Sequence, residues 1–275
     1  MKLNPSNQLE LLIHGNVLKN LIFLYQKDKL PNKILLKGQK GIGKSTLAYH
    51  LINFVLSKNE DFPYDIDHFK IDEKNRSFKL INNGSSPNFF LIDIQADKKN
   101  INIDQIRNII QDLNKSSLNN KPKFVLIDNS EYLNKSSVNV LLKEIEEPND
   151  NIYFILIQNQ KTLLSTLTSR FIKFNINLTY KESIFVINKL INDNIHNSVN
   201  SDFINYYFSP GNIYKMIDFC DENNIDLKNI ELKDFVNILI QNNHIKKQKD
   251  LRHIFYEIIE CLLKKNLDSI HYLLI

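Results

Sequence analysis

Short apolar runs alternate with segments of helical periodicity over the first two thirds of the chain. The runs are nearly continuous, which is typical of strands buried on both faces of a parallel sheet. Between them, apolar residues recur every three or four positions, as in residues 103–113 and 138–145. This alternation predicts an α/β domain whose sheet has five parallel strands. The expected strands are 34–37, 88–93, 123–128, 152–157 and 171–174.

After residue 177 no strand pattern returns, and the apolar spacing is helical throughout. A Ser-Pro-Gly break at 209–211 interrupts the helical pattern. We expect an α/β domain over 1–177, a small helical domain over 178–225 and a short helical domain over 226–275. Residues 58–86 are polar and irregular, and the pattern gives them no place in the fold. The expected helices are 181–192, 201–208, 213–223, 232–241 and 251–263.

Composition narrows the classes of function. A chain of 275 residues with 43% apolar positions suffices for about two domains. The net charge of +4 is too slight to indicate nucleic-acid binding by itself. Two cysteines can form neither a disulfide framework nor a four-cysteine site, so we expect no zinc. No apolar run approaches the roughly 20 residues of a membrane span, and no signal peptide is visible, so we expect a cytoplasmic protein without membrane contact.

The strongest motif is the segment Gly38–Ser45, which fits G-x-x-x-x-G-K-[ST] between an expected strand and an expected helix over 46–56. Its glycines let successive backbone N–H groups point at one anion, and the helix N-terminus adds partial positive charge. Lys44 would then meet the β- and γ-phosphates of a nucleotide, and Ser45 would offer its hydroxyl to Mg²⁺. The alternative is a simple glycine turn before a helix. Three of the six glycines in the chain lie in this loop, which favours a phosphate site.

Polar residues at the ends of later strands suggest the rest of such a site. Asp128 closes the third expected strand and could hold Mg²⁺ through water, or could instead cap a turn. The next residue, Asn129, cannot serve as a carboxylate base, so efficient hydrolysis at this site is not expected. Glu131 is the nearest alternative acid. Asn159 follows the fourth strand, where it could contact a phosphate or merely cap a turn.

Five groups of residues, in this order along the chain, resemble one family. Together they are similar to the AAA+ clamp-loader subunits of bacterial DNA polymerase III, and most of all to the delta-prime type. The resemblance extends over about residues 8–174. It implies a P-loop domain, a helical lid and a collar, ATP and Mg²⁺ as ligands, and other clamp-loader subunits, the sliding clamp and primed DNA as partners. The groups are His14-Gly15 with Leu30–Lys33 and the phosphate loop, Ile103–Arg107, Leu126–Asn134, Leu141–Pro148, and Thr166–Phe171.

The same resemblance assigns roles to individual residues. It implies that Arg170 reaches into a neighbouring subunit's ATP site as an arginine finger. Without the resemblance, an ordinary surface arginine is an equally good interpretation of Arg170. Such a guanidinium neutralises charge that develops on the transferred phosphoryl group. Ser45 and Asp128 would hold Mg²⁺ with the nucleotide. The expected nucleotide contacts are Gly38, Gly41, Gly43, Lys44, Ser45, Thr46, Asp128 and Asn159.

The chain also departs from the family pattern. Residues 209–212 read Ser-Pro-Gly-Asn where the family's ATPases often carry a phosphate-contacting arginine, which argues against turnover a second time. Relatives often carry a four-cysteine zinc module where residues 58–88 contain no cysteine, and the helical tail beyond 226 is short for a collar. A basic cluster near the end could contact DNA phosphates or form a solvated face. Its members are Lys246, Lys247, Lys249 and Arg252.

These observations predict a delta-prime-like subunit that binds ATP, hydrolyses it poorly, lends Arg170 to a neighbour and helps load a sliding clamp. One alternative is a gamma/tau-type ATPase motor of the same machine. Another is a free-standing P-loop NTPase, which the intact phosphate loop supports but for which no acceptor-pocket residues can be named.

Overall fold

The computed structural model describes residues 4–95, 98–113, 119–146, 151–159, 162–204, 209–247 and 251–273. The chain divides into two compact units, Met1–Asn177 and Leu178–Ile275. The first contains the sheet, and the described part of the second is helical. Among the described residues no helix is both long and apolar enough to cross a membrane.

A five-stranded sheet forms the centre of the first unit, with the strands in the order β2-β3-β4-β1-β5. All neighbouring strands pair in parallel. The expected α/β fold is therefore confirmed, and each strand lies within two residues of its expected position. The strands are β1 (Lys33–Lys37), β2 (Phe89–Ile92), β3 (Lys123–Ile127), β4 (Ile152–Gln158) and β5 (Ile172–Asn175).

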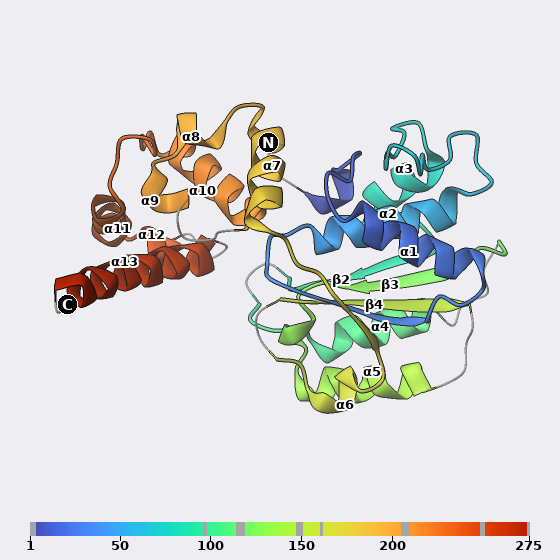
Figure 1. The fold of residues 1–275 in the computed structure, drawn as a ribbon. Helices are drawn as coiled ribbons and strands as arrows, with labels where there is room; N and C mark the ends of the chain where they lie inside the picture. The colour runs from blue at the N-terminus through green and yellow to red at the C-terminus, as the bar shows by residue number, and fades with distance from the viewer. Residues whose placement is uncertain are drawn as a thin grey trace. The chain divides into compact units, whose positions relative to one another are not determined.

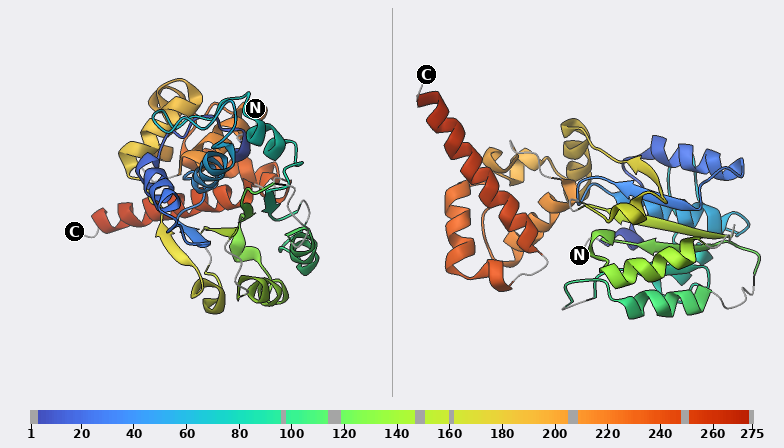
Figure 2. Two further views of the ribbon diagram at one scale, coloured as in Figure 1. Left: turned by 90° about the vertical axis from the view of Figure 1, so that its right-hand side faces the viewer. Right: turned by 90° about the horizontal axis from the view of Figure 1, so that it is seen from below.

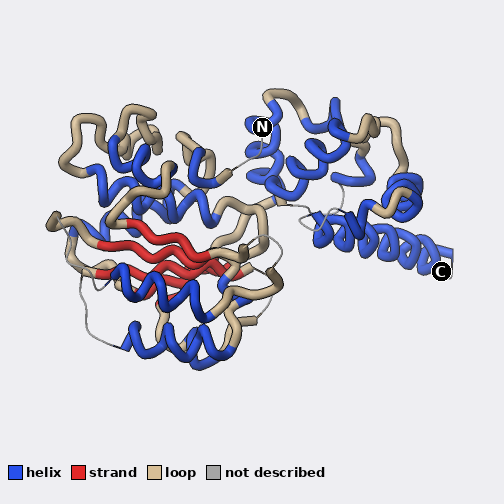
Figure 3. Tube along the Cα trace, turned by 180° about the vertical axis from the view of Figure 1, so that it is seen from behind, coloured by secondary structure: helices blue, strands red, loops and turns tan. Residues whose placement is uncertain are grey.

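Helices cover both faces of this sheet, with α1, α2 and α3 on one side and α4, α5 and α6 on the other (Figures 1 and 3). Every residue of β3 is buried, which explains its unbroken apolar run. The outer strands depart from the expected burial on both faces, because β2 has one buried residue and β5 has none. The 3-10 helices of this unit are η1 (Pro5–Asn7) and η2 (Ser130–Tyr132). The helices are α1 (Gly15–Gln26), α2 (Lys44–Ser57), α3 (Arg76–Asn82), α4 (Ile103–Leu113), α5 (Lys135–Glu146) and α6 (Ser165–Thr168).

Residues 58–86, which the sequence pattern left unplaced, fold back on α2 through buried polar contacts. Asn53 of α2 donates a hydrogen bond of 3.0 Å to Asn75, and the Ser57 hydroxyl accepts one of 3.0 Å from the Tyr64 N–H. Glu60 accepts a hydrogen bond of 2.7 Å from Lys121. Polar contacts, together with isolated buried side chains such as Ile71 and Ile81, thus place this segment. Buried apolar residues so far apart leave no regular spacing in the sequence.

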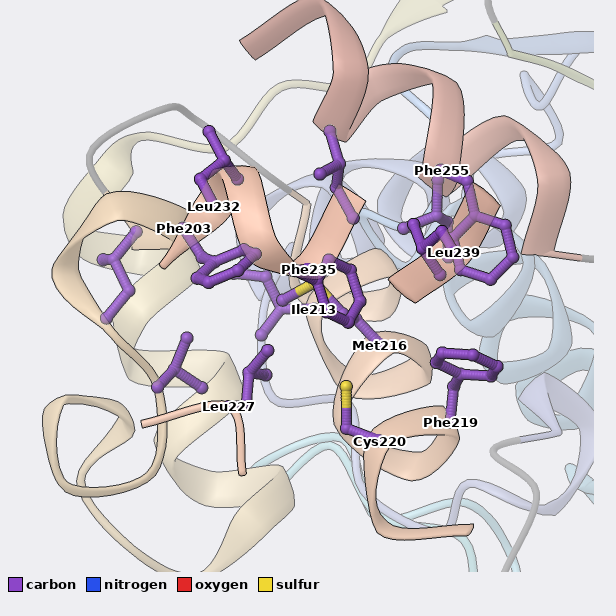
Figure 4. Close-up of a cluster of buried hydrophobic side chains, with 14 of the residues drawn as sticks. Phe203, Ile213, Met216, Phe219, Cys220, Leu227, Leu232, Phe235, Leu239 and Phe255 are labelled. Carbon is purple, nitrogen blue, oxygen red and sulfur yellow. The ribbon is translucent and has the colours of Figure 1, made fainter. Parts of the chain in front are cut away.

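The second unit packs its helices around one apolar cluster, part of which is drawn in Figure 4. The cluster joins Phe203 and Met216 to Phe235 and Phe255, so side chains from both sides of residue 225 share it. The expected division at that point stays a prediction. The helices are α7 (Tyr180–Ile191), α8 (Ile195–Ser198), α9 (Ser201–Ile204), α10 (Pro210–Glu222), α11 (Leu232–Gln241), α12 (His244–Lys247) and α13 (Arg252–Leu273).

Two helices of this unit differ in length from the expectation. The helix expected over 201–208 is described only as α9, because residues 205–208 lie outside the described part of the chain. The last helix, α13, continues to Leu273, well past the expected end at 263 (Figure 2). Its described buried side chains are Ile254, Phe255 and Ile258.

Candidate nucleotide-binding site

The carboxyl ends of the strands bring the candidate residues together. Because all five strands are parallel, the segments that follow them leave the sheet at one edge. The phosphate loop follows β1, Asp128 follows β3 and Asn159 follows β4. Asp93, which follows β2, joins them there. Residues far apart in the sequence thus meet at a single edge.

Glycine is required at several points of the loop. A Cβ atom on Gly38 would lie 2.2 Å from the carbonyl oxygen of Ile176, so only glycine allows this close approach. Gly41 and Gly43 have φ angles of +82° and +89°, which side chains disfavour. Gly43 is also the N-cap of α2 and has no side chain to cap it. The first-turn N–H groups of α2 can therefore bind an anion.

Lys44 is the buried cation of the site. Its side chain is only 3% exposed, and Nζ donates hydrogen bonds to the carbonyl oxygens of Gly38 and Gln39. It also donates one of 2.9 Å to Oδ1 of Asn159. Burial lowers the pKa of Lys44 to about 8, although the nearby carboxylates of Asp128 and Glu131 partly oppose this shift. A bound phosphate would place a further negative charge beside the buried ammonium and so favour its protonated form.

Ser45 and Asp128 form the part of the site that suits a divalent cation. The Ser45 hydroxyl donates a hydrogen bond of 2.6 Å to Oδ2 of Asp128. Burial raises the pKa of Asp128, opposed by the bond from Ser45 and further raised by the Asp93 carboxylate. Hydroxyl and carboxylate oxygens are ligands that Mg²⁺ accepts. Thr46 lies beside them in the first turn of α2.

Asn129 lies at the centre of a chain of hydrogen bonds across the strand ends. Its Nδ2 donates to Oδ1 of Asp93 at 2.8 Å, and its Oδ1 accepts from Nδ2 of Asn159 at 3.1 Å. Asn159 in turn accepts from Lys44. Both ends of the Asn129 amide are therefore engaged. Glu131, the alternative acid, accepts a hydrogen bond of 3.2 Å from the backbone N–H of Asn159.

Two of these contacts were not expected from the sequence. Asp93 was included in an expected strand, although an aspartate that closes an apolar run is the signal that also singled out Asp128. His14, at the start of α1, contacts the loop through Nε2, which lies 2.7 Å from the Ile42 carbonyl oxygen. No local pattern predicts this contact, because residues 14 and 42 are distant in sequence. His14 was named only as one of the residues that carry the family resemblance.

Arg170 lies apart from this cluster. It precedes β5, so it is at the amino edge of the sheet, and the four residues of β5 span about 13 Å. Its Nε donates to Oε1 of Glu146 at 2.7 Å, and its Nη1 donates to the Thr166 carbonyl oxygen at 2.7 Å. The side chain is 38% exposed. Arg170 and the phosphate loop of the same chain thus occupy opposite edges.

The remaining candidates belong to the second unit. Asn212, in the Ser-Pro-Gly-Asn stretch, is buried and donates a hydrogen bond of 2.9 Å from Nδ2 to Glu257 of α13. Its amide is thus engaged within the helical unit. In the basic cluster, Arg252 donates from Nε to the Ile245 carbonyl oxygen at 3.0 Å, and Lys249 lies outside the described residues.

Comparison with known proteins settles the family. A family model described as DNA polymerase III, delta subunit, matches residues 13–179, which is more than half of the chain. The chain belongs to the DNA polymerase III delta subunit family. Within that family the resemblance to the delta-prime type is confirmed, because the delta-prime subunit of Bacillus subtilis is 31% identical over 160 residues. That match covers 58% of this chain and 46% of the relative.

Two other similarities accompany this membership. The DNA polymerase III gamma subunit of Buchnera aphidicola (strain Sg) is 26% identical over 237 residues, covering 83% of this chain and 63% of the relative. A gamma subunit-related protein from Thermotoga maritima has a TM-score of 0.40 and 22% identity, covering 62% of this chain and 49% of that one. The chain spans 40–49% of the length of three delta-prime relatives that it matches.

Proposed function

We propose that this chain acts as a delta-prime subunit of a clamp loader in DNA replication, in the cytoplasm. In this role it assembles with other clamp-loader subunits and helps to open a sliding clamp and release it on primed DNA. It binds ATP and turns it over poorly. Family membership supports a role in the clamp loader. The geometry of the two sheet edges supports nucleotide binding at one edge and the action of Arg170 on another subunit at the other edge.

The phosphate loop provides the residues that would hold the nucleotide. The N–H groups of the loop and of the first turn of α2 would bind the phosphates, with Lys44 as the counter-charge. Ser45 and Asp128 would hold Mg²⁺, which neutralises phosphate charge when it is bound. Asn159 already contacts the Lys44 ammonium at 2.9 Å, so it orients the lysine within the site.

The observation that carries the proposal is the amide at position 129. Hydrolysis needs a group that orients or deprotonates the attacking water. Here the residue after Asp128 is an amide, and both its nitrogen and its oxygen bond to neighbouring side chains. Residue 129 therefore has no carboxylate with which to accept a proton, and the carboxylate of Glu131, the alternative acid, accepts a hydrogen bond from the Asn159 backbone N–H at 3.2 Å. A site of this kind retains triphosphate without efficient cleavage.

Arg170 completes the proposed role by serving another subunit. It lies at the edge opposite its own phosphate loop, so a nucleotide that it contacts belongs to a different chain. Glu146 and the Thr166 carbonyl oxygen hold its guanidinium in place, while more than a third of the side chain remains exposed. An arginine supplied in trans at the γ-phosphate accelerates hydrolysis by roughly 10³–10⁵.

An assay of ATP binding and hydrolysis tests the proposal directly. The purified chain alone should bind radiolabelled ATP with little turnover, and Lys44→Ala should abolish the binding. Mixing the chain with gamma-type subunits should raise hydrolysis by the mixture. Rapid multiple turnover by the chain alone would contradict the proposal.

The gamma/tau-type motor is the second candidate, favoured by the extent of the gamma subunit match, which covers 83% of this chain. It predicts measurable hydrolysis by the isolated chain that Lys44→Ala removes. The same assay therefore separates the two candidates.

A further inference from the structure

The segment that sequence analysis left unplaced contacts the N-terminal residues that precede α1. Phe69 accepts a backbone hydrogen bond of 3.0 Å from the Leu11 N–H, and the Ile71 N–H donates one of 2.8 Å to Leu9. Between these two bonds, Glu10 and Lys70 form an isolated antiparallel bridge and an ion pair of 3.5 Å. Residues 69–71 thus hold residues 9–11 through two backbone hydrogen bonds and an isolated bridge.

Phe69 also fixes the start of α1. Its ring packs against Gly15, where a Cβ atom would lie 2.6 Å from the nearest ring carbon. The φ angle of Phe69 is +54°, which is rare for a bulky residue and persists only where the surroundings impose it. The Lys19 ammonium lies 5.2 Å from the centre of the ring. The ring and the first turn of α1 therefore form a closely fitted contact.

His14 links this contact to the phosphate loop. It directly precedes Gly15, has a φ angle of +68°, and is 8% exposed. Its Nε2 lies 2.7 Å from the carbonyl oxygen of Ile42. Since a carbonyl only accepts hydrogen bonds, Nε2 is the donor. The ring also lies beside Gly43, where a Cβ atom would be 3.8 Å from Cδ2 of His14.

The chemistry of the peptide group gives this bond a consequence for anion binding. The Ile42 carbonyl and the Gly43 N–H belong to one planar trans peptide, in which C=O and N–H point in opposite directions. A donor that holds the carbonyl therefore also fixes the direction of the N–H. Gly43 has a φ angle of +89° and no side chain, so nothing in the residue itself restricts this peptide group.

We propose that His14 is a positioning residue for the phosphate loop, and that residues 69–71 keep it in place through Phe69. His14 sets the orientation of the Ile42–Gly43 peptide, and Phe69 sets the position of His14 by packing on Gly15. The segment 58–86 thereby acquires a role in nucleotide affinity. This inference rests on the proposed nucleotide binding at the loop.

Substitution of His14 tests the inference with two measurements, which are nucleotide affinity and backbone hydrogen exchange of residues 38–46 in the nucleotide-free chain. His14→Ala should weaken binding of a fluorescent ATP analogue roughly 3- to 10-fold, as expected for one hydrogen bond. It should also speed exchange in the loop. His14→Gln should restore both values, because its Nε2 amide donates from a similar distance along the side chain.

Phe69 variants test the second half of the inference, with an exposed phenylalanine of the same segment as control. Phe69→Ala should change affinity and loop exchange in the same direction as His14→Ala, and Phe62→Ala should change neither. If Phe69→Ala does not fold, Phe69→Leu keeps an apolar side chain but lacks the ring, and should give a smaller change of the same sign.

The outcomes separate this inference from the proposed function. If the wild-type chain binds no nucleotide but His14→Ala still loosens the loop, the proposed function fails and with it the role in nucleotide affinity, whereas the positioning of the loop by His14 stands. If the wild-type chain binds and His14→Ala alters neither affinity nor loop exchange, the inference is overturned. It is also overturned if His14→Gln folds as the wild type does but fails to restore either value.

Discussion

Each of the two edges of the sheet carries a cationic side chain, and the two cations differ in burial and in the groups to which they bond. At the carboxyl edge, Lys44 is 3% exposed and its hydrogen bonds go to the loop's own carbonyls and to Asn159. At the amino edge, the Arg170 side chain is 38% exposed and pairs with the half-exposed Glu146. Burial lowers the pKa of Lys44 to about 8, which makes its positive charge costly until an anion arrives.

Under the proposed function, this difference would let one domain serve two nucleotides. A buried ammonium enclosed by a glycine loop can act only on a ligand that enters that loop. An exposed guanidinium, held at one side by a carboxylate, still has N–H groups to offer to another chain. We expect the two edges to respond independently to mutation, since neither cation contacts the other's partners.

The largest expected effect separates the edges. In the reconstituted clamp loader, Arg170→Ala should lower ATP hydrolysis at the adjoining site by roughly 10³-fold or more, because the transition-state charge loses its partner. ATP binding by the isolated chain should not change, as measured by nucleotide titration. Arg76→Ala, an exposed arginine at the start of α3, is the control. An Arg170→Ala assembly with full hydrolytic activity would contradict the role of this edge.

A carboxylate at position 129 should convert the carboxyl edge toward turnover. Asn129→Glu combined with Asp93→Asn should raise hydrolysis by the isolated chain about 100-fold, within the range for one general base. Asn129→Glu alone should gain less, because the new carboxylate would face Asp93, which now accepts a hydrogen bond of 2.8 Å from Asn129. Single-turnover kinetics measure both. Equal rates for the single and double variants would show that Asp93 does not influence position 129.

The pH dependence of binding should reveal the buried lysine. In the nucleotide-free chain, Lys44 loses its proton above about pH 8. In the complex with nucleotide it keeps this proton, so binding above pH 8 takes up a proton. ATP affinity should therefore fall about tenfold between pH 7 and pH 9, as measured by calorimetry or fluorescence. Lys44→Arg should show no such fall, since arginine stays protonated. A flat wild-type profile would mean that Lys44 is not the titrating contact.

The smallest effect should come from the ion pair that holds Arg170. Glu146→Gln removes the charge but keeps an acceptor, and should lower trans-activated hydrolysis by about 2- to 5-fold, as exposed ion pairs contribute little. Asp104→Asn, which removes the charge of an exposed ion pair in α4, is the matched control. If Glu146→Gln matched the loss in Arg170→Ala, the carboxylate would have a larger role than holding the guanidinium.

Much of the fold could be predicted from the sequence. The inner strands β1, β3 and β4 are mostly buried and leave apolar runs that mark them in the sequence. The outer strands β2 and β5 are more exposed, yet their short apolar runs also placed them to within two residues. Helix α11 was placed at its observed bounds. The glycine loop could be recognised because its spacing is local. Helix α1 was not among the expected elements, although Leu18, Leu21 and Ile22 show helical spacing and are buried.

The contacts that complete the site could not be predicted in the same way. Asp93 meets Asn129 only because β2 and β3 pair in register, and Ile92 lies opposite Ile127. His14 contacts the Ile42 carbonyl oxygen although 28 positions separate the two residues along the chain. Such contacts join residues that are distant in sequence and polar, so they leave no periodic signal.

The sequence by itself determined the strands, the phosphate loop and the family, because each depends on local spacing or on the order of short motifs. Only the tertiary structure decided which polar groups meet, that the Asn129 amide is engaged at both ends, and that Arg170 lies at the edge opposite its own loop. The physical reason is that a parallel sheet brings all carboxyl ends to one side and all amino ends to the other. That arrangement exists only once distant strands have paired.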